Sequence, residues 1–86
     1  MGEWVGKIEF QPEIERKLRN KHQLTPDQVR SAVALGAHDH AEWHDDPSYG
    51  LRLMLTGEDA DGPILAYLRP LDRSDGVWEC LTAWRL

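Results

Sequence analysis

The stretch LTPDQVRSAVALG, residues 24–36, predicts a helix whose start and end are both marked. Thr25 is a natural N-cap, and Pro26 suits the first helical position because its missing N–H would be unpaired there anyway. Gln28 completes a capping box with Thr25. Gly36 is placed to end the helix in the left-handed conformation. The apolar positions that such a helix would bury follow at helical spacing: Val29, Ala32, Val33 and Leu35.

A second helix is expected just before this one. Pro12 fits a first helical turn, and the acidic residues that follow it precede the basic ones, an order that suits the helix dipole. Ile14 and Leu18 lie one turn apart and form a narrow apolar stripe. Before this helix, residues 4–10 place apolar side chains among charged ones around Gly6, which predicts an opening strand.

After residue 36 the apolar positions alternate instead of following a helical period, which indicates strands. Short connections rich in Gly, Asp and Pro favour antiparallel pairing of such strands. The expected fold class is therefore α+β in a single domain, residues 1–86: a strand, two helices, then an antiparallel meander of three to four strands. The predicted strands of the meander are residues 38–44, 51–56, 64–71 and 77–86, and the predicted turns and loops are 45–50, 57–63 and 72–76.

The amino-acid composition disfavours several classes of function. The 15 acidic and 10 basic residues give a formal net charge of −5, which disfavours non-specific binding to phosphate backbones but is compatible with a local basic patch. Cys80 is the only cysteine, so neither an intrachain disulfide nor a cluster of thiolate metal ligands can form. No export signal and no apolar run long enough for a membrane span is present, which predicts a cytoplasmic protein without a membrane partner.

Three short segments carry a family resemblance: IEFQP at residues 8–12, KHQLT at 21–25 and WECLTAWR at 78–85. They resemble the opening strand, the link between the two helices and the closing strand of the RelE/ParE superfamily of bacterial toxins, with the BrnT-like branch nearest. The resemblance implies a ribonuclease toxin of a type II toxin–antitoxin pair. Such a toxin acts on mRNA, free or on the ribosome, and is neutralised by an antitoxin encoded beside it. Catalysis in that superfamily uses side chains on the open sheet face and needs no metal or other cofactor.

Four residues form the candidate catalytic set: Arg52, Arg69, Tyr67 and His44. Tyr67 lies two residues before Arg69 and so shares its strand face, and Arg52 can face the same side on the neighbouring strand. RNA cleavage of this kind needs a base for the 2′-hydroxyl and cations for the charge that grows on the phosphate. We expect Arg52 and Arg69 to bind the phosphate, and Tyr67 or His44 to orient or deprotonate the hydroxyl.

Arg73 and Arg85 are expected to extend this surface as RNA-binding residues, because a guanidinium binds phosphate oxygens with two parallel donors. The alternative is that the strand arginines solvate an exposed sheet face and pair with Asp and Glu. His22 follows the basic end of the first helix, where it is either a general base or a surface cap.

Residues 38–46, HDHAEWHDD, hold the densest group of polar side chains. On a strand, His38, His40, Glu42 and His44 would share one face, and such ligands suit Zn²⁺. Side chains two positions apart on a strand are spaced about 6.5–7 Å, however, so more than two are hard to bring to one ion. A metal-dependent hydrolase is therefore a distant alternative, and a solvated strand edge is the simpler interpretation.

The four tryptophans lead to a further hypothesis. Trp78 and Trp84 lie six positions apart, so the alternation predicts that both face the core with Cys80 buried between them. Trp4 and Trp43 fall near expected sheet edges, where they suit interface anchors; stacking platforms for bases are the other interpretation. The second functional hypothesis is accordingly a non-catalytic module that dimerises or holds a protein partner through an aromatic surface.

Overall fold

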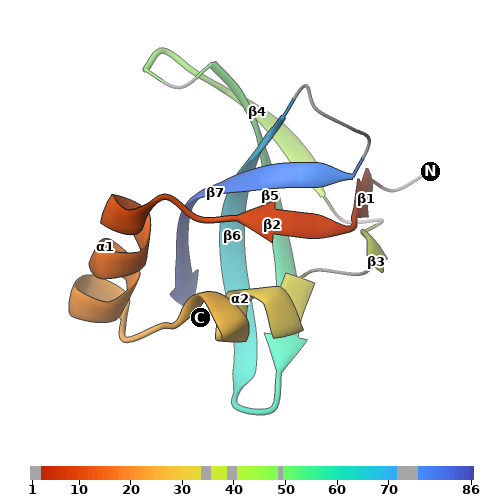
Figure 1. The fold of residues 1–86 in the computed structure, drawn as a ribbon. Helices are drawn as coiled ribbons and strands as arrows, with labels where there is room; N and C mark the ends of the chain where they lie inside the picture. The colour runs from red at the N-terminus through yellow and green to blue at the C-terminus, as the bar shows by residue number, and fades with distance from the viewer. Residues whose placement is uncertain (1–2, 34–35, 39–40, 49, 72–75) are drawn as a thin grey trace.

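The computed structural model describes residues 3–33, 36–38, 41–48, 50–71 and 76–86, and these form an α+β fold (Figure 1). Two helices lie between short N-terminal strands and a run of longer strands. The elements are β1 (Glu3–Val5), β2 (Lys7–Glu9), α1 (Pro12–His22), α2 (Pro26–Val33), β3 (Gly36–His38), β4 (Glu42–Asp46), β5 (Gly50–Asp59), β6 (Gly62–Pro70) and β7 (Val77–Arg85).

The main sheet has five strands in the order β2-β7-β6-β5-β4. The strands from β4 to β7 pair antiparallel with their neighbours in the chain, whereas β2 pairs parallel with β7, so the sheet is mixed. A separate two-stranded sheet joins β1 to β3. α2 packs across β5 and β6, and α1 packs beside β7 (Figure 1). α2 does not cross the opposite sheet face, and α1 only borders that face at β7; we call it the open face.

The second helix begins as the sequence predicts. The backbone N–H of Gln28 donates to Thr25 Oγ1 at 3.3 Å, and the N–H of Thr25 donates to Gln28 Oε1 at 2.9 Å. Both bonds of the capping box are therefore formed. The described part of α2 runs to Val33, and the predicted buried residue Leu35 lies outside the described residues. The predicted left-handed cap at Gly36 is wrong, because Gly36 starts β3 opposite Val5.

The first helix starts at Pro12, as predicted, and ends at His22, which is followed by a strained residue. Gln23 adopts the left-handed conformation, with φ 54° and ψ 39°, which costs free energy in any residue with a Cβ. The Leu24 N–H then donates to the Leu18 carbonyl at 3.0 Å and closes the helix end. Leu18 and Leu24 are both fully buried, so this turn directs the chain into the core.

The opening strand predicted over residues 4–10 is two strands, because the chain changes sheets at Gly6. The N–H groups of Gly6 and Lys7 both donate to the Gly76 carbonyl at 2.9 Å. Gly76 has a φ of 80°, and a Cβ there would come within 2.7 Å of Trp4 Cδ1. The Trp4 carbonyl in turn accepts a 2.9 Å hydrogen bond from Trp78 Nε1. The switch between sheets thus depends on a backbone contact that local alternation does not reveal.

The loop predicted over residues 57–63 is too long, because β5 continues to Asp59, β6 begins at Gly62, and only residues 60–61 form the turn. Gly57 lies inside β5, where a Cβ would sit 2.0 Å from the Ala32 carbonyl oxygen of α2. The glycine is therefore needed for close approach of helix and strand rather than for a turn. Similarly, the predicted strand 38–44 is divided between β3 and β4, and β4 runs into the predicted turn as far as Asp46.

A β-bulge in β7 changes which tryptophan reaches the core. Leu68 pairs with Cys80 and Tyr67 pairs with Thr82, so Leu81 is an extra residue and the alternation shifts after it. Trp78 is only 5% exposed and Cys80 is fully buried, as expected, but Trp84 faces the open side instead of the core. Ala83 takes the buried place. The buried core of the described residues is Val5, Ile8, Leu18, Leu24, Val29, Val33, Leu53, Leu55, Ile64, Ala66, Leu68, Trp78, Cys80 and Ala83.

Candidate nucleic-acid interface on the open face

A group of rings and one guanidinium gathers around Tyr67 on the open face. The Arg52 guanidinium carbon lies 4.1 Å from the centroid of the Tyr67 ring, within the range of a cation–π contact. The His44 ring meets Tyr67 edge-on at 5.8 Å between centroids, and the Trp84 ring lies at 5.9 Å. We call these four residues, His44, Arg52, Tyr67 and Trp84, the Tyr67 cluster.

Strand register places these side chains together. His44 on β4 pairs with Arg52 on β5, and Met54 on β5 pairs with Tyr67 on β6. Because side chains two positions apart share a face, His44, Arg52 and Tyr67 all face the open side. Trp84 joins them from β7 only because of the bulge. Three of the four candidate catalytic residues therefore lie in one cluster.

The Arg52 guanidinium is held from two sides. Its Nη2 lies 3.2 Å from Asp46 Oδ2, and the two side chains are only 20% and 23% exposed. Its Nε atom is buried and has no hydrogen-bond partner within the described residues. An unmatched buried donor costs free energy, so this arginine retains an unused capacity to donate.

His44 has a carboxylate beside it. Its Nε2 atom lies 3.3 Å from Glu42 Oε2, two residues earlier on the same strand face. A carboxylate at one ring nitrogen selects the tautomer and fixes the ring orientation. Both side chains are accessible to solvent.

Arg69 lies apart from the cluster. Its guanidinium forms an ion pair with Glu79, which is opposite it on β7 and only 8% exposed as a residue. The pair lies in a groove between α1 and β7 with a volume of about 350 Å³, which Lys17 and Leu81 also line. The structure therefore places Arg69 beside α1 rather than against Tyr67.

Arg85 lies at the other end of the sheet. Its two terminal nitrogens donate to the Asp59 carboxylate at 2.9 and 3.1 Å, and Nη1 also donates to the Gly62 carbonyl at 3.2 Å. These hydrogen bonds from Arg85 hold the pKa of Asp59 below its ordinary value and raise the pKa of Arg85. Arg85 thus links the β5–β6 hairpin to β7, and its contacts in the structure stabilise the fold.

Two sets of candidate residues lie wholly or partly outside the described part of the chain. Arg73 falls in the segment 72–75, and of the histidine-rich segment the structure leaves out residues 39–40. Among the residues that are described, no group of three His, Cys, Asp or Glu side chains is arranged to hold a metal ion. Burial raises the pKa of the Cys80 thiol to about 12, which removes it as a nucleophile at neutral pH.

Sequence reasoning missed the extent of the aromatic surface. The Trp84 ring contacts not only Tyr67 but also His22, at 6.3 Å between centroids. His22 is the last residue of α1, so the rings run without a break from that helix end to β4. The one available signal was the surplus residue Leu81, which becomes visible only when the partner strand is known.

Comparison with models of known protein families, with curated proteins and with solved structures finds no match to this chain. None of the helices in the described ranges has both the length and the apolar character needed to cross a bilayer.

Proposed function

We propose that this protein is a RelE-like toxin of the BrnT-like branch, a cytoplasmic, metal-independent ribonuclease that acts on mRNA through the Tyr67 cluster. The observation that carries the proposal is the meeting of a cation, a phenol and an imidazole on a sheet face that no helix covers. Arg52, Tyr67 and His44 are the residue types that cleavage through a 2′-hydroxyl requires. The order of elements, with two helices before the last four strands, is a second line of support.

The reaction assigns one role to each side chain. His44 removes the proton of the 2′-hydroxyl, and Glu42 orients its ring. The oxygen attacks the adjacent phosphorus, the bond to the 5′-oxygen of the next nucleotide breaks, and a proton from solvent completes that leaving hydroxyl. Arg52 stabilises the negative charge on the phosphate oxygens, and Tyr67 positions the guanidinium. The products are a 2′,3′-cyclic phosphate and a 5′-hydroxyl.

Arg52 must exchange partners for this role. Its guanidinium is paired with Asp46, but a guanidinium carries five N–H donors, and the Nε donor has no partner in the structure. A change of the Arg52 rotamer that releases Asp46 would let a phosphate accept from this donor, which the folded protein leaves unmatched. Arg69 contributes less directly, because Glu79 occupies it.

The partners that the proposal requires are RNA, free or on a ribosome, and an antitoxin that covers the open face. No membrane takes part. A folded open face with half-buried rings is a surface that a protein inhibitor can bury, since aromatic and arginine side chains are favoured at the centre of interfaces.

The decisive experiment compares two matched arginine variants. Arg52 lies over Tyr67 and pairs with Asp46; Arg30 lies 4.8 Å from the Phe10 centroid and pairs with Asp27, away from the open face. We expect the wild type and Arg30→Ala to arrest bacterial growth on induction and to cleave mRNA in EDTA. Arg52→Ala should lose about a hundredfold or more in cleavage rate. Normal growth and intact RNA at high wild-type expression would contradict the proposal.

A second candidate is a non-catalytic module that dimerises or holds a protein partner. Its support is the pairing of Arg52, Arg69 and Arg85 with carboxylates, which neutralises the strand arginines in a chain of net charge −5. Sedimentation of the purified protein separates the candidates. Stable self-association without RNA cleavage favours the module, and a monomer that cleaves RNA favours the toxin.

A further inference from the structure

Two groups of cations in the described residues differ in whether they have carboxylate partners. The strand arginines Arg52, Arg69 and Arg85 each have a carboxylate partner. The second group belongs to α1 and has none: within the described residues, no carboxylate lies within ion-pair distance of these side chains. It comprises Arg16, Lys17, Arg19 and Lys21, four of the ten basic residues of the chain.

The missing pairs on α1 are not a matter of sequence spacing. Glu13 and Lys17, and likewise Glu15 and Arg19, are four residues apart, the spacing at which helical ion pairs form. Neither pair closes, and the C-terminal half of the helix contains no acidic residue. Among the described residues of this acidic protein, four of the five cations without a carboxylate partner therefore lie on one helix, and the fifth is Lys7 on β2.

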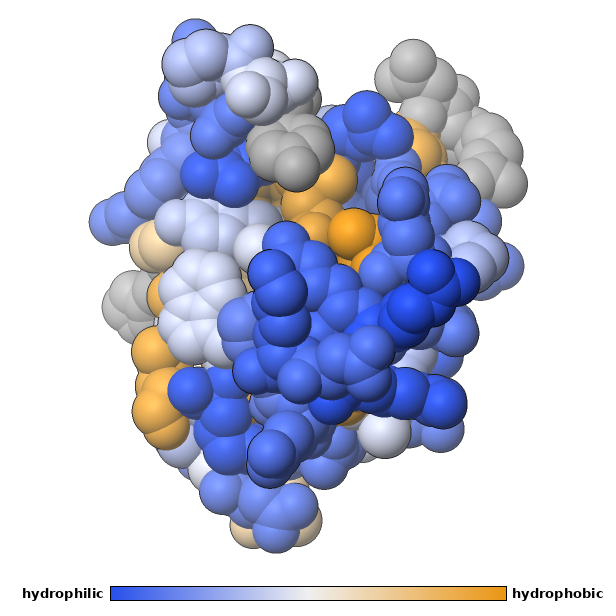
Figure 2. Space-filling view, turned by 90° about the vertical axis from the view of Figure 1, so that its left-hand side faces the viewer, coloured by the Kyte–Doolittle hydropathy of each residue, from blue (hydrophilic) through white to orange (hydrophobic). Residues whose placement is uncertain are grey.

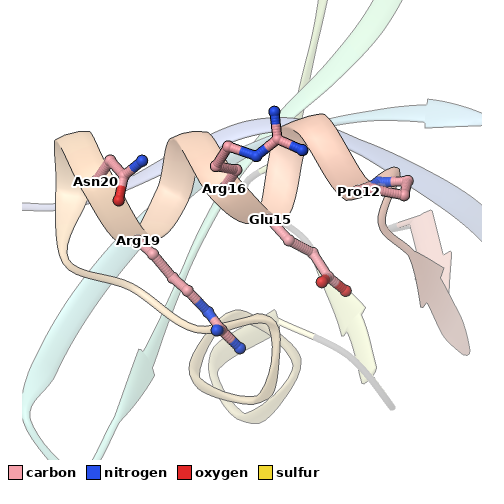
Figure 3. A pocket seen from close by; sticks show the side chains of 5 residues that line it. All are labelled: Pro12, Glu15, Arg16, Arg19 and Asn20. Atoms are coloured by element: carbon pink, nitrogen blue, oxygen red, sulfur yellow. The ribbon is translucent and has the colours of Figure 1, made fainter.

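Arg16, Arg19 and Lys21 are exposed on α1, whereas Lys17 lines the groove between α1 and β7. In Figure 3, Arg19 and Glu15 extend toward α2, while Arg16 points to the other side of the helix. A shallow hollow of about 350 Å³ lies along this stretch, lined by Pro12, Glu15, Arg16, Arg19 and Asn20. Figure 2, which turns the α1 side of the molecule toward the viewer, shows hydrophilic atoms over most of that side.

α1 leads directly to the aromatic surface. Its last residue, His22, contacts Trp84, and Trp84 contacts Tyr67. Because Arg52 lies over Tyr67, the rings best placed to stack on an incoming base are Trp84 and His22. Cations followed by accessible rings are the two features by which proteins hold unpaired nucleic acid strands.

We infer that α1 and Trp84 together form a binding track for single-stranded RNA: the helix cations hold the backbone, and Trp84 stacks a base beside the Tyr67 cluster. This inference rests on the proposed function, because it names the strand that the cluster would cleave. Duplex RNA would present phosphates to α1 but no free base faces to Trp84. An anionic membrane would likewise engage only the cations.

The test measures binding without cleavage. The probe is a fluorescein-labelled 2′-O-methyl RNA of about twelve nucleotides, a length within the usual range for single-strand sites. Its blocked 2′-oxygen prevents the reaction, so binding is measured whether or not the protein is a nuclease. Anisotropy is recorded from low to high salt for the wild type, Arg16→Gln/Arg19→Gln and Trp84→Leu. The matched control is Lys7→Gln/Arg30→Gln, which removes the same charge elsewhere.

The variants should separate the two parts of the track. The α1 double variant should weaken binding about tenfold and flatten the plot of log affinity against log salt by about 1.4, the contribution of two phosphate contacts to a single strand. Trp84→Leu should weaken binding about tenfold with an unchanged slope, because stacking releases no counterions. The control double variant should behave as the wild type, and duplex RNA should bind more weakly. Circular dichroism confirms folding, and glutamine preserves the helix.

Three results would overturn the inference: an unchanged slope in the α1 double variant, equal binding of duplex and single strand, or wild-type binding to phosphatidylglycerol vesicles but not to RNA. The proposed function fails separately. A wild type that binds the blocked RNA through α1 but cleaves no mRNA refutes the ribonuclease and leaves the track intact. A wild type that cleaves mRNA while the α1 variant binds normally refutes the track alone.

Discussion

The two faces of the sheet differ although they come from the same strands. On β5, Leu53 and Leu55 face the helix side and are at most 1% exposed. Arg52, directly before Leu53, faces the open side and lies against Tyr67. The covered face is tightly packed: at Gly57 only the absence of a side chain leaves room for the Ala32 carbonyl of α2. The open face is held by rings and ion pairs, which can exchange partners without unfolding. Packing thus specifies the fold on one face and leaves the other available for binding.

The largest expected difference between the faces concerns two tryptophans of β7. Trp78→Ala should lower the free energy of unfolding by about 3–5 kcal/mol, because it empties a core site. Trp84→Ala should cost only about 1–2 kcal/mol, because the ring is part exposed on the open face. Urea unfolding of both variants measures the difference. Equal losses would mean that Trp84 packs in the core and that the bulge at Leu81 is absent.

A methyl group added to the covered face should be nearly as damaging. Gly57→Ala places a Cβ against the Ala32 carbonyl and should cost about 3 kcal/mol, since neither backbone can move aside without separating α2 from β5. Thr56→Val, on the neighbouring exposed position, should change stability by less than about 0.5 kcal/mol. The midpoints of urea unfolding give both values. A harmless Gly57→Ala would contradict the close helix–strand contact.

A smaller effect is expected at the end of the sheet, where pH controls the Asp59–Arg85 pair. Because the hydrogen bonds from Arg85 lower the pKa of Asp59, the pair stabilises the fold above the ordinary carboxyl pKa and ceases to do so as pH falls through the lowered value. Between about pH 5 and pH 3 the wild type should therefore lose stability more steeply than Asp59→Asn. Thermal melts of both proteins across this pH range test the prediction. Equal changes of melting temperature with pH would show that the Asp59–Arg85 pair does not contribute to acid destabilisation.

The smallest predicted change is a gain. Gln23→Gly should raise the free energy of unfolding by about 0.5 kcal/mol, because glycine accepts the left-handed conformation without steric cost but loses more chain entropy on folding. Gln28→Gly should instead lower it by about 1–2 kcal/mol through loss of the capping box. Melting temperatures report both signs. A loss on Gln23→Gly would show that the glutamine side chain contributes more than its strain costs.

Local signals explain which parts of the fold were predictable. Thr25 and Gln28 lie within four residues of each other and predict a helix start, and they form the predicted hydrogen bonds of a capping box. Cys80, which lies in the sequence between Trp78 and Trp84, is buried as expected. In contrast, the role of Gly57 depends on a helix that packs over it from a distant part of the sequence, and turn propensity alone misassigns it. The parallel pairing of β2 with β7 has no local signal at all.

The candidate site divides along the same line. Strand alternation places Arg52 and Tyr67 on one face, and the structure brings them into contact. Strict alternation fails after a bulge, because the extra residue Leu81 reverses the side on which the following residues lie. Trp84 was therefore assigned to the wrong face of β7. Alternation also does not predict ion-pair partners. Arg69 pairs with Glu79 and Arg85 pairs with Asp59, and both pairs depend on how the strands align in the folded sheet. The catalytic roles of these residues stay predictions.

The parallel pairing of β2 with β7 has a kinetic consequence. It joins Lys7 to Val77, so almost the whole described chain must be ordered before the sheet closes. Contacts of such wide separation slow folding, because the chain must close a long loop before they form. Trp84 is on the same strand, β7, so the strand that completes the Tyr67 cluster also carries this long-range pairing. A molecule in which β7 has not yet joined the sheet carries the residues of the cluster without its geometry.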